Sequence, residues 1–227
     1  MKVIIGSWKL GDFFRNFLAI VLGVVVTFVG SDMISEHNSQ KELAKAMQLV
    51  KSELLLNRQE VSKMQERMLF ERKSCYYLME YRGRMKEASR DSLNKYASAP
   101  FQNAYFTFVN DAMEMLKTSS LIQKIEDKEL ALQIIKSYAG IKESDSSFQF
   151  FSEAKSRLQT GMASNPEINK FMSENCDVID IWDFLFKYSE GVNLVQQIPN
   201  IHGNEIPFQN CLDMLDQAIA AIDKEYS

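Results

Sequence analysis

The sequence contains few of the residues on which tight turns depend. Nine Gly and four Pro occur among its 227 residues. A β-sandwich or β-barrel reverses direction many times and uses these residues at its turns, so their scarcity favours a few long helices. The length is sufficient for one domain with its own core, or for one domain plus an appendage. We therefore expect an all-α fold.

Cysteine and histidine, which build many redox and zinc sites, are also scarce. The residues Cys75, Cys176 and Cys211 are far apart and form no CxxC pair, so we expect buried thiols. One disulfide is the alternative if the domain lies outside the cytoplasm. His37 and His202 belong to no HExxH or ExxH pattern. This composition predicts no metal site.

Motifs for nucleotide binding and hydrolysis are missing as well. The sequence has no P-loop, no GxGxxG loop and no GxSxG elbow. Acidic residues recur at every third position from Glu174 to Asp183, but without the glycine of an EF-hand loop, so we interpret them as a solvated helix face. The sequence predicts no catalytic, cofactor-binding or metal-binding residue and a protein that is not an enzyme.

The net charge is −4, and the chain lacks the basic footprint of a nucleic-acid-binding protein. Basic residues are concentrated between Arg58 and Arg90, whereas acidic residues dominate from Glu167 onward. We interpret this asymmetry as a basic long helix packed beside an acidic C-terminal half. A basic face for lipid headgroups or a protein partner is the alternative. Nucleic acid is not an expected partner.

The strongest local signal is an apolar segment at residues 13–34. Its centre, residues 17–30, has no charged side chain, and a membrane-spanning helix requires about 20 mostly apolar residues. Arg15 and Asp32 would lie at the two interfaces. We predict one transmembrane helix over residues 13–34, preceded by a flank at residues 1–12. Its membrane-spanning residues include Phe17, Leu18, Ile20, Leu22, Val25 and Phe28.

A cleaved signal peptide is the alternative for this segment, with small residues near Ser31 as a cleavage point. Against it, the region before the apolar centre is long, and the helical pattern continues past Ser31. A buried core helix is a third interpretation, but an apolar surface all round is unusual in a small domain. Basic residues precede the segment and acids follow it, which places the bulk of the chain outside the cytoplasm.

A long helix is predicted after the apolar segment, over about residues 35–86. Pro is absent from this range, and Gly83 is its only Gly. Apolar residues recur at alternating steps of four and three, the spacing of a helix with one packed seam. This candidate interaction seam contains Leu43, Met47, Val50, Leu54, Asn57, Val61 and Met64.

Two polar residues, Asn57 and Glu71, fall within the register of this seam. A polar side chain at a core position can fix the register or the oligomeric state of packed helices. The interpretation we favour is that the bundle opens to solvent at these positions. One chain does not distinguish internal packing from a dimer seam.

Shorter helices are expected to complete a helical bundle domain over residues 35–227. The aromatic-rich stretch from Phe101 to Lys117 has helical spacing and is expected in the core. Asp127 is expected to cap a helix that ends at Gly140, and Ser144 to cap the next helix.

The C-terminal part is expected to contain a strongly apolar core helix, capped by Asp177, that stops near Gly191. The clearest loop is expected from Ile198 to Gly203. A final amphipathic helix is expected to start at Pro207.

Two stretches together resemble a known family. The first is the apolar helix leading into residues 42–43 and 49–57, and the second comprises residues 112–122, 125–130 and 134–138. They resemble an uncharacterised bacterial family, common in Bacteroidota, that has one N-terminal membrane helix and a helical domain of unknown function. The resemblance implies membrane anchoring and helicity, and it carries over no functional residue.

The expected function is that of a membrane-anchored helical scaffold or protein-interaction module. Its expected location is the bacterial inner membrane, as a single-pass protein. Its expected partners are the lipid bilayer and either a protein partner or a second copy of the chain. The alternative is an extracytoplasmic helical sensor or ligand-binding domain, which would need a partner because no second membrane helix or output domain is evident.

Overall fold

The computed structural model describes residues 7–172, 176–203 and 205–226, with side chains from Asn38 onward within those ranges. Every regular element of the described residues is helical, which confirms the all-α prediction. The α-helices are α1 (Ser7–Glu80), α2 (Arg90–Tyr96), α3 (Asp111–Thr118), α4 (Lys128–Ala163), α5 (Pro166–Met172), α6 (Val178–Leu185), α7 (Ser189–His202) and α8 (Gln209–Tyr226). Short 3-10 helices occur at Met85–Glu87, Ala99–Phe101 and Leu121–Lys124.

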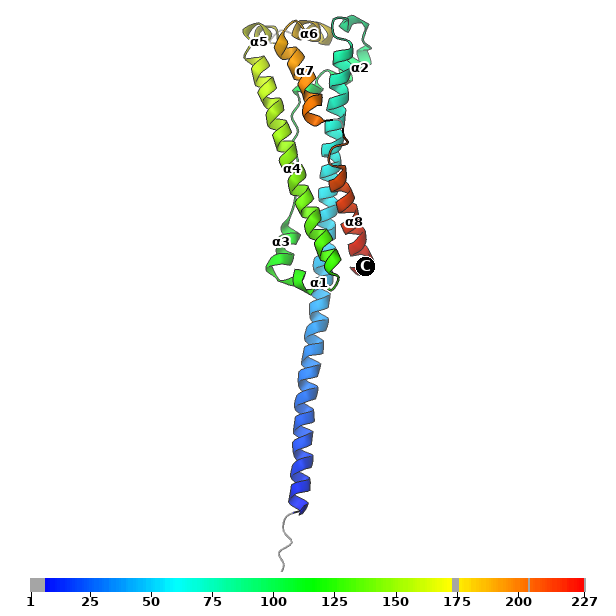
Figure 1. Ribbon diagram of the computed structural model, residues 1–227, viewed down its shortest axis with the longest axis vertical. Coiled ribbons are helices and arrows are strands. Elements are labelled where there is room, and N and C mark those ends of the chain that lie inside the picture. The colour runs from blue at the N-terminus through cyan, green and yellow to red at the C-terminus, as the bar shows by residue number, and fades with distance from the viewer. Residues whose placement is uncertain (1–6, 173–175, 204, 227) are drawn as a thin grey trace, which may run out of the picture.

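The first helix, α1, is continuous over 74 residues, which corresponds to about 110 Å at a rise of ~1.5 Å per residue. Its N-terminal part extends beyond the bundle as a single helix, whereas its C-terminal part is packed within it (Figure 1). It ends at Glu80, close to the predicted end, and Gly83 follows with φ of +78°, a conformation that favours glycine.

The predicted transmembrane segment, residues 13–34, lies outside the residues whose side chains are described. Among the residues with described side chains, no helix has the length and apolar character needed to span a bilayer.

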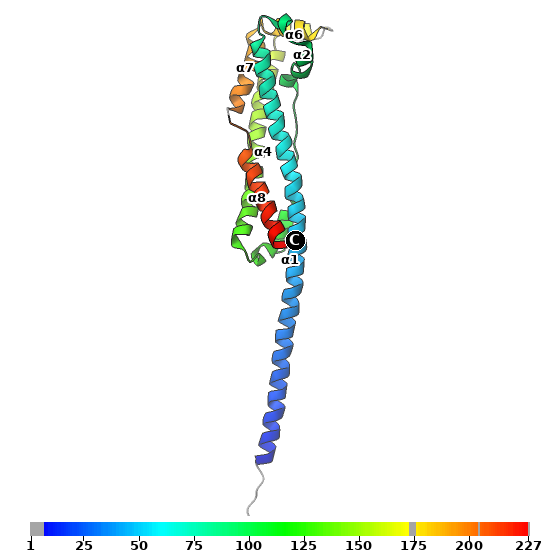
Figure 2. The ribbon, with the colours of Figure 1, turned by 90° about the vertical axis from the view of Figure 1, so that its right-hand side faces the viewer.

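The bundle is built around the two long helices α1 and α4. These two helices ascend side by side, and α7 followed by α8 descends along both of them (Figures 1 and 2). The helices α2, α5 and α6 lie together at the upper end, and α3 lies at the lower end where α1 leaves the bundle. The C-terminus of α8 also lies at this lower end.

The core divides into two apolar clusters along the length of the bundle. The lower cluster packs α1 residues from Leu43 to Val61 against α3, the first part of α4, and α8. The upper cluster packs α1 residues from Met64 to Leu78 against the second part of α4, α6 and α7. Trp182 is buried in the upper cluster and stacks on Phe101, with ring centroids 5.4 Å apart.

Both predicted aspartate caps are confirmed. Asp127 accepts hydrogen bonds from the main-chain N–H groups of Glu129 and Leu130 at the start of α4. Asp177 accepts one from Ile179 at the start of α6. Each cap satisfies donors that the first helical turn leaves unpaired.

The prediction that a helix ends at Gly140 is wrong, because α4 continues through it to Ala163. A Cβ at this position would lie 2.5 Å from Met214 Cε and 3.6 Å from Cys211 Sγ. This glycine therefore lies where α8 packs closely on α4, against the flexible end of Met214, and it does not act as a C-cap. The local propensity of glycine to end a helix is overridden by this packing.

The predicted boundaries of the two following helices also need correction. The helix capped by Asp177 ends at Leu185, and Gly191 lies within α7. A Cβ on Gly191 would lie 2.3 Å from the carbonyl oxygen of Leu185, so this glycine allows α7 to pack against the end of α6. Pro199 lies inside α7, so the predicted loop is confined to the residues after His202, and α8 begins at Gln209.

The largest difference from the sequence prediction concerns residues 102–110, which we call the strap. The sequence predicts a helix from Phe101 to Lys117, but only Asp111–Thr118 is helical. The strap runs along the bundle as an extended segment, from the upper end down to α3 (Figures 1 and 2). It occupies the position that a second descending helix would take in a four-helix bundle.

Candidate binding groove

The side chains of the strap alternate between the bundle and solvent. Ala104, Phe106 and Phe108 are partly buried, whereas the residues between them are exposed. Tyr105 is 90% exposed, and Phe106 packs edge-to-face on Phe148 of α4, with ring centroids 4.9 Å apart. This period of two is that of a β-strand with one buried face.

The main chain of the strap is held at its lower end by α1. Asn57 Nδ2 donates to Val109 O at 2.7 Å, and Val109 N donates to Asn57 Oδ1 at 2.9 Å. Among the described residues, the main-chain groups of Asn103 to Phe108 form no hydrogen bond. The strap is therefore an unpaired extended segment between two tethered ends.

The bonds of Val109 also establish which edge of the strap faces α1. In an extended chain, the N–H and C=O groups of successive residues point to opposite edges. Since both groups of Val109 face α1, those of Tyr105 and Thr107 face the same edge. The groups of Phe106 and Phe108 consequently face the opposite edge, while the Phe106 ring itself packs on α4.

A buried carboxylate connects the lower end of the strap to the start of α3. Glu53 accepts hydrogen bonds from Ala112 N at 2.9 Å and Met113 N at 3.3 Å, and also from the Tyr138 hydroxyl. A negative charge at this place satisfies the free N–H groups of the helix N-terminus. Burial and the neighbouring Glu53 carboxylate raise the pKa of the Tyr138 hydroxyl, so it remains protonated as a donor.

A buried ion pair holds the upper end of the strap. Lys155 on α4 bonds to Glu71 on α1 and to the carbonyl oxygen of Gln102, and the exposed fractions of Lys155 and Glu71 are 3% and 1%. Burial raises the pKa of Glu71 and lowers that of Lys155, while the attraction between the two charges opposes both shifts. Arg67 adds a bond to Gln102 O at 3.1 Å.

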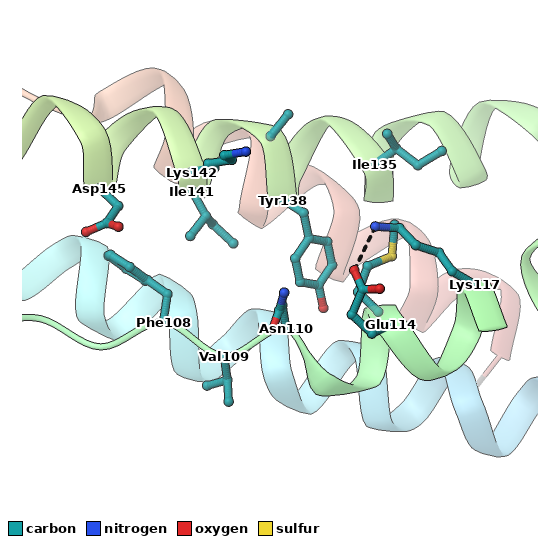
Figure 3. A pocket seen from close by; sticks show the side chains of 12 residues that line it. Phe108, Val109, Asn110, Glu114, Lys117, Ile135, Tyr138, Ile141, Lys142 and Asp145 are labelled. Carbon is teal, nitrogen blue, oxygen red and sulfur yellow. Dashed lines mark hydrogen bonds and ion pairs between the residues drawn. The ribbon is translucent and has the colours of Figure 1, made fainter.

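A pocket of about 530 Å³ lies between the lower half of the strap, α3 and α4 (Figure 3). Its apolar walls include Phe108 and Ile141, and the Tyr138 ring projects across it from α4 toward Asn110 and Glu114. Charged side chains surround these walls: Glu114, Lys117, Lys142 and Asp145. Glu114 and Lys117 pair with each other at 3.0 Å.

A second pocket, of about 450 Å³, lies higher between the strap and α4. Ala104 and Phe106 contribute strap residues to its lining, and Ser152 and Arg157 contribute from α4. Asp145 lines both pockets. We call the two pockets together the strap groove, because they follow one another between the strap and α4.

His202 at the end of α7 is a third feature of the interior. Its side chain is 1% exposed, and its ring lies edge-to-face on Phe151, with centroids 4.0 Å apart. Within the described residues neither ring nitrogen forms a hydrogen bond, and Nε2 lies 3.7 Å from Glu71 Oε2. Burial, together with the positive charges of Arg72 and Lys155, lowers the pKa of His202 to about 3.

The residues of the candidate interaction seam are buried in the core of this single chain. All seven have no exposed area: Leu43, Met47, Val50, Leu54, Asn57, Val61 and Met64. Asn57 and Glu71 are buried rather than open to solvent, and each has a dedicated partner. Their partners come from the strap and from α4, elements that the spacing of α1 alone does not reveal.

The predicted charge complementarity appears as ion pairs between α1 and the C-terminal half. Arg58 pairs with Asp216, with a second contact at 3.0 Å, and Lys51 pairs with Asp223. Arg90, the first residue of α2, pairs with Asp177. These pairs are largely exposed, so each contributes only about 0–1 kcal/mol and mainly selects the arrangement.

Sequence reasoning did not identify the strap groove, although the alternation of Ala104, Phe106 and Phe108 was a signal for it. Within the described part of the chain, no cluster of three His, Cys, Asp or Glu side chains could hold a metal ion. The three cysteines are free thiols. Comparisons of the chain with protein-family models, with curated proteins and with solved structures find no match.

Proposed function

We propose that this protein is a membrane-tethered interaction module that performs no catalysis of its own. One observation carries the proposal: α1 is a single helix from Ser7 to Glu80. The same helix contains the apolar segment at residues 13–34 and forms the centre of the bundle. If the apolar segment is inserted in a bilayer, one continuous helix therefore connects the membrane to the bundle.

The position of the apolar segment favours a transmembrane anchor in this proposal. Residues 17–30 carry no charge, and α1 extends away from the bundle over this range. An uncharged helix that has no neighbour in the bundle would expose its apolar surface to water, at a cost of about 25 cal/mol per Å². Insertion into a bilayer removes this cost. The resemblance to a bacterial family with one membrane helix favours the inner membrane.

The interaction role is supported by the surface of the bundle rather than by its core. The strap leaves a groove with apolar walls, and Tyr105 beside it is 90% exposed. Large exposed aromatic side chains next to apolar pockets are typical of protein-binding surfaces. We place the binding surface on the strap and on the adjoining face of α4.

Site-specific photocrosslinking in native membranes tests this proposal. A photoreactive phenylalanine analogue would replace Tyr105 in one variant of the full chain and Tyr76 in a matched control. Tyr76 is 54% exposed on α1, away from the strap groove. We expect discrete adducts from position 105 and none from position 76. The absence of adducts from position 105, or equal adducts from both positions, contradicts the proposal.

A sensor or ligand-binding domain is the second candidate, and one observation favours it. The lower pocket, at about 530 Å³, falls in the range of small-molecule sites, ~300–1,000 Å³. A ligand in this pocket would contact both Tyr138 and α3. Stabilisation of the purified chain by a small molecule, lost on Tyr138→Ala, would favour the sensor over the interaction module.

A further inference from the structure

The connection between α7 and α8 lies beside two pockets that do not belong to the strap groove. Their volumes are about 460 and 590 Å³, and they share five lining residues: Glu143 and Ser147 of α4, His202 of α7, and Pro207 and Phe208 of the connection. Because they adjoin through these residues, we call them together the connector groove. Each volume falls in the range of small-molecule sites, ~300–1,000 Å³.

The connection is fixed to α1 by hydrogen bonds to its main chain. Arg72 donates to the carbonyl oxygens of Gly203 at 2.8 Å and Glu205 at 3.0 Å. Gln65 donates to the carbonyl oxygen of Pro207 at 2.7 Å. The connector groove therefore has a tethered wall opposite α4.

The charge of the connector groove has one sign. Glu143 lines both pockets and Glu205 lines the larger one, whereas no Lys or Arg occurs among the described lining residues. Neither glutamate forms an ion pair with another described residue. The pockets of the strap groove, by contrast, contain Lys117, Lys142 and Arg157. The connector groove therefore attracts a cation and repels an anion.

Aromatic side chains lie beside these acidic groups. Phe150 is 65% exposed, and it lines the smaller pocket together with Phe151 and Phe208. Ile206, which lines the larger pocket, is 58% exposed. The faces of aromatic rings attract cations and also bury the apolar surface of a ligand. Rings and carboxylates together suit an organic cation with an apolar body.

His202 adds an unsatisfied hydrogen-bonding group at the boundary of the two pockets. Its side chain is 1% exposed, and neither ring nitrogen has a hydrogen-bond partner among the described residues. Nearly all buried polar groups in proteins have such a partner, which can be a bound molecule. The positive charges of Arg72 and Lys155 help to keep His202 neutral. The charge of a bound cation therefore belongs near Glu143 rather than at this ring.

We propose that the connector groove binds a small organic cation with an aromatic body. Its ammonium group lies beside the Glu143 carboxylate, and its ring packs on Phe150 and Phe208. This site is separate from the strap groove, and it needs neither the membrane anchor nor a protein partner. Failure of this proposal therefore does not count against the interaction role.

Three probes of similar shape and different charge test the proposal. Phenethylammonium, 2-phenylethanol and 3-phenylpropanoate would each be titrated calorimetrically into the full chain in a nonionic detergent, with the detergent alone as the blank. We expect saturable one-to-one binding of phenethylammonium, and affinities weaker by about fivefold or more for the neutral and anionic probes. Because these comparisons use the unaltered protein, they do not depend on the folding of a variant.

Two variants test where the cation binds. Glu143→Gln removes the charge with little change of shape, and Phe150→Leu removes the ring but keeps an apolar side chain. Each should weaken the binding of phenethylammonium by about two- to fivefold. The matched control is Glu153→Gln, an exposed position on α4 that lines the strap groove instead, where we expect no change. All three positions are exposed, so the helical circular dichroism should be unchanged.

The expected result is binding of phenethylammonium that depends on both Glu143 and Phe150. The proposal is overturned if this cation does not bind saturably, if the three probes bind equally, or if either variant leaves the affinity unchanged. An equal loss for Glu153→Gln would assign the attraction to the acidic charge of the whole chain and would also overturn it.

Discussion

Asn57 on α1 and Val109 in the strap bond to each other twice, through Nδ2 to O at 2.7 Å and from N to Oδ1 at 2.9 Å. One side-chain amide thereby satisfies both main-chain groups of a residue outside any helix. In the sequence, Asn57 interrupts an apolar seam. In the fold, it is where α1 holds the lower end of the strap.

Replacing Asn57 with Leu is expected to lower the free energy of unfolding by about 1–3 kcal/mol, because it leaves the N–H and C=O of Val109 without partners. Urea denaturation of the variant measures this loss. The matched control is Asn94→Leu, an exposed position on α2, where we expect a change within about 0.5 kcal/mol. Equal effects at the two positions would show that the bonds to Val109 contribute nothing.

Breaking the buried ion pair of Glu71 and Lys155 is expected to lower the free energy of unfolding strongly. Lys155→Met leaves the Glu71 carboxylate buried without its cation, and the expected loss of stability is about 3–5 kcal/mol. The double variant Glu71→Leu with Lys155→Met removes both charges, so its loss should be smaller than the sum of the two single losses. Chemical denaturation of all four proteins gives this double-mutant cycle, and strictly additive losses would refute the coupling.

The stability of the bundle is expected to decrease in acid partly through His202. Its pKa is about 3 in the folded chain and about 6.5 in the unfolded chain. The folded state therefore excludes a proton that the unfolded state binds. The contribution of neutral His202 is complete above about pH 6.5 and is lost as the pH falls toward 3, with a slope of up to about 1.4 kcal/mol per pH unit.

Unfolding free energies measured across this pH range for the wild type and for His202→Asn check the prediction. The difference between the two curves should change between pH 6.5 and 3 and be constant above pH 7. A constant difference throughout would mean that His202 titrates alike in both states.

Substitution by alanine is expected to have opposite effects on the stability of the bundle at two helical glycines. In the interior of a helix, alanine is more favourable than glycine by about 1 kcal/mol. At Gly140 the nearest atom to a new Cβ is Met214 Cε, the end of a flexible side chain, so Gly140→Ala should be close to neutral or mildly stabilising. At Gly191 the nearest atom is the carbonyl oxygen of Leu185, at 2.3 Å.

Because main-chain atoms cannot move as freely as a methionine tip, Gly191→Ala should destabilise the bundle by about 1–3 kcal/mol. Thermal denaturation of the two variants side by side measures the contrast. A stabilised Gly191→Ala variant would be inconsistent with the described packing of α7 on α6.

Local chemistry in the sequence predicted the long helix and the starts of two other helices, but not where several of the shorter helices end. The absence of proline and the four-and-three spacing predicted α1 beyond Leu43, and Asp127 and Asp177 predicted two helix starts, since capping depends on adjacent residues. The strap was missed because its aromatic residues satisfy a helical spacing as well as a period of two. Tertiary packing decided between these patterns.

The candidate site was less accessible to sequence reasoning than the fold. The groove depends on residues from the strap, α3 and α4 that are distant in sequence, and the partners of Asn57 and Glu71 come from those elements. The structure describes side chains only from Asn38 onward, which leaves out those of Phe17 to Phe28. The membrane anchor is therefore a prediction from the sequence.

Membrane fractionation of the full chain tests the central claim most directly. The native chain and a variant carrying Leu22→Arg and Val25→Arg would be compared in carbonate-washed membranes, with intact mass spectrometry of each fraction. Arginine at the centre of a spanning helix costs about 2.5–3.5 kcal/mol per residue. We predict that the native chain stays in the washed membranes at its full mass and that the variant is lost from them. A native chain in the soluble fraction, or one shortened near Ser31, would contradict the account.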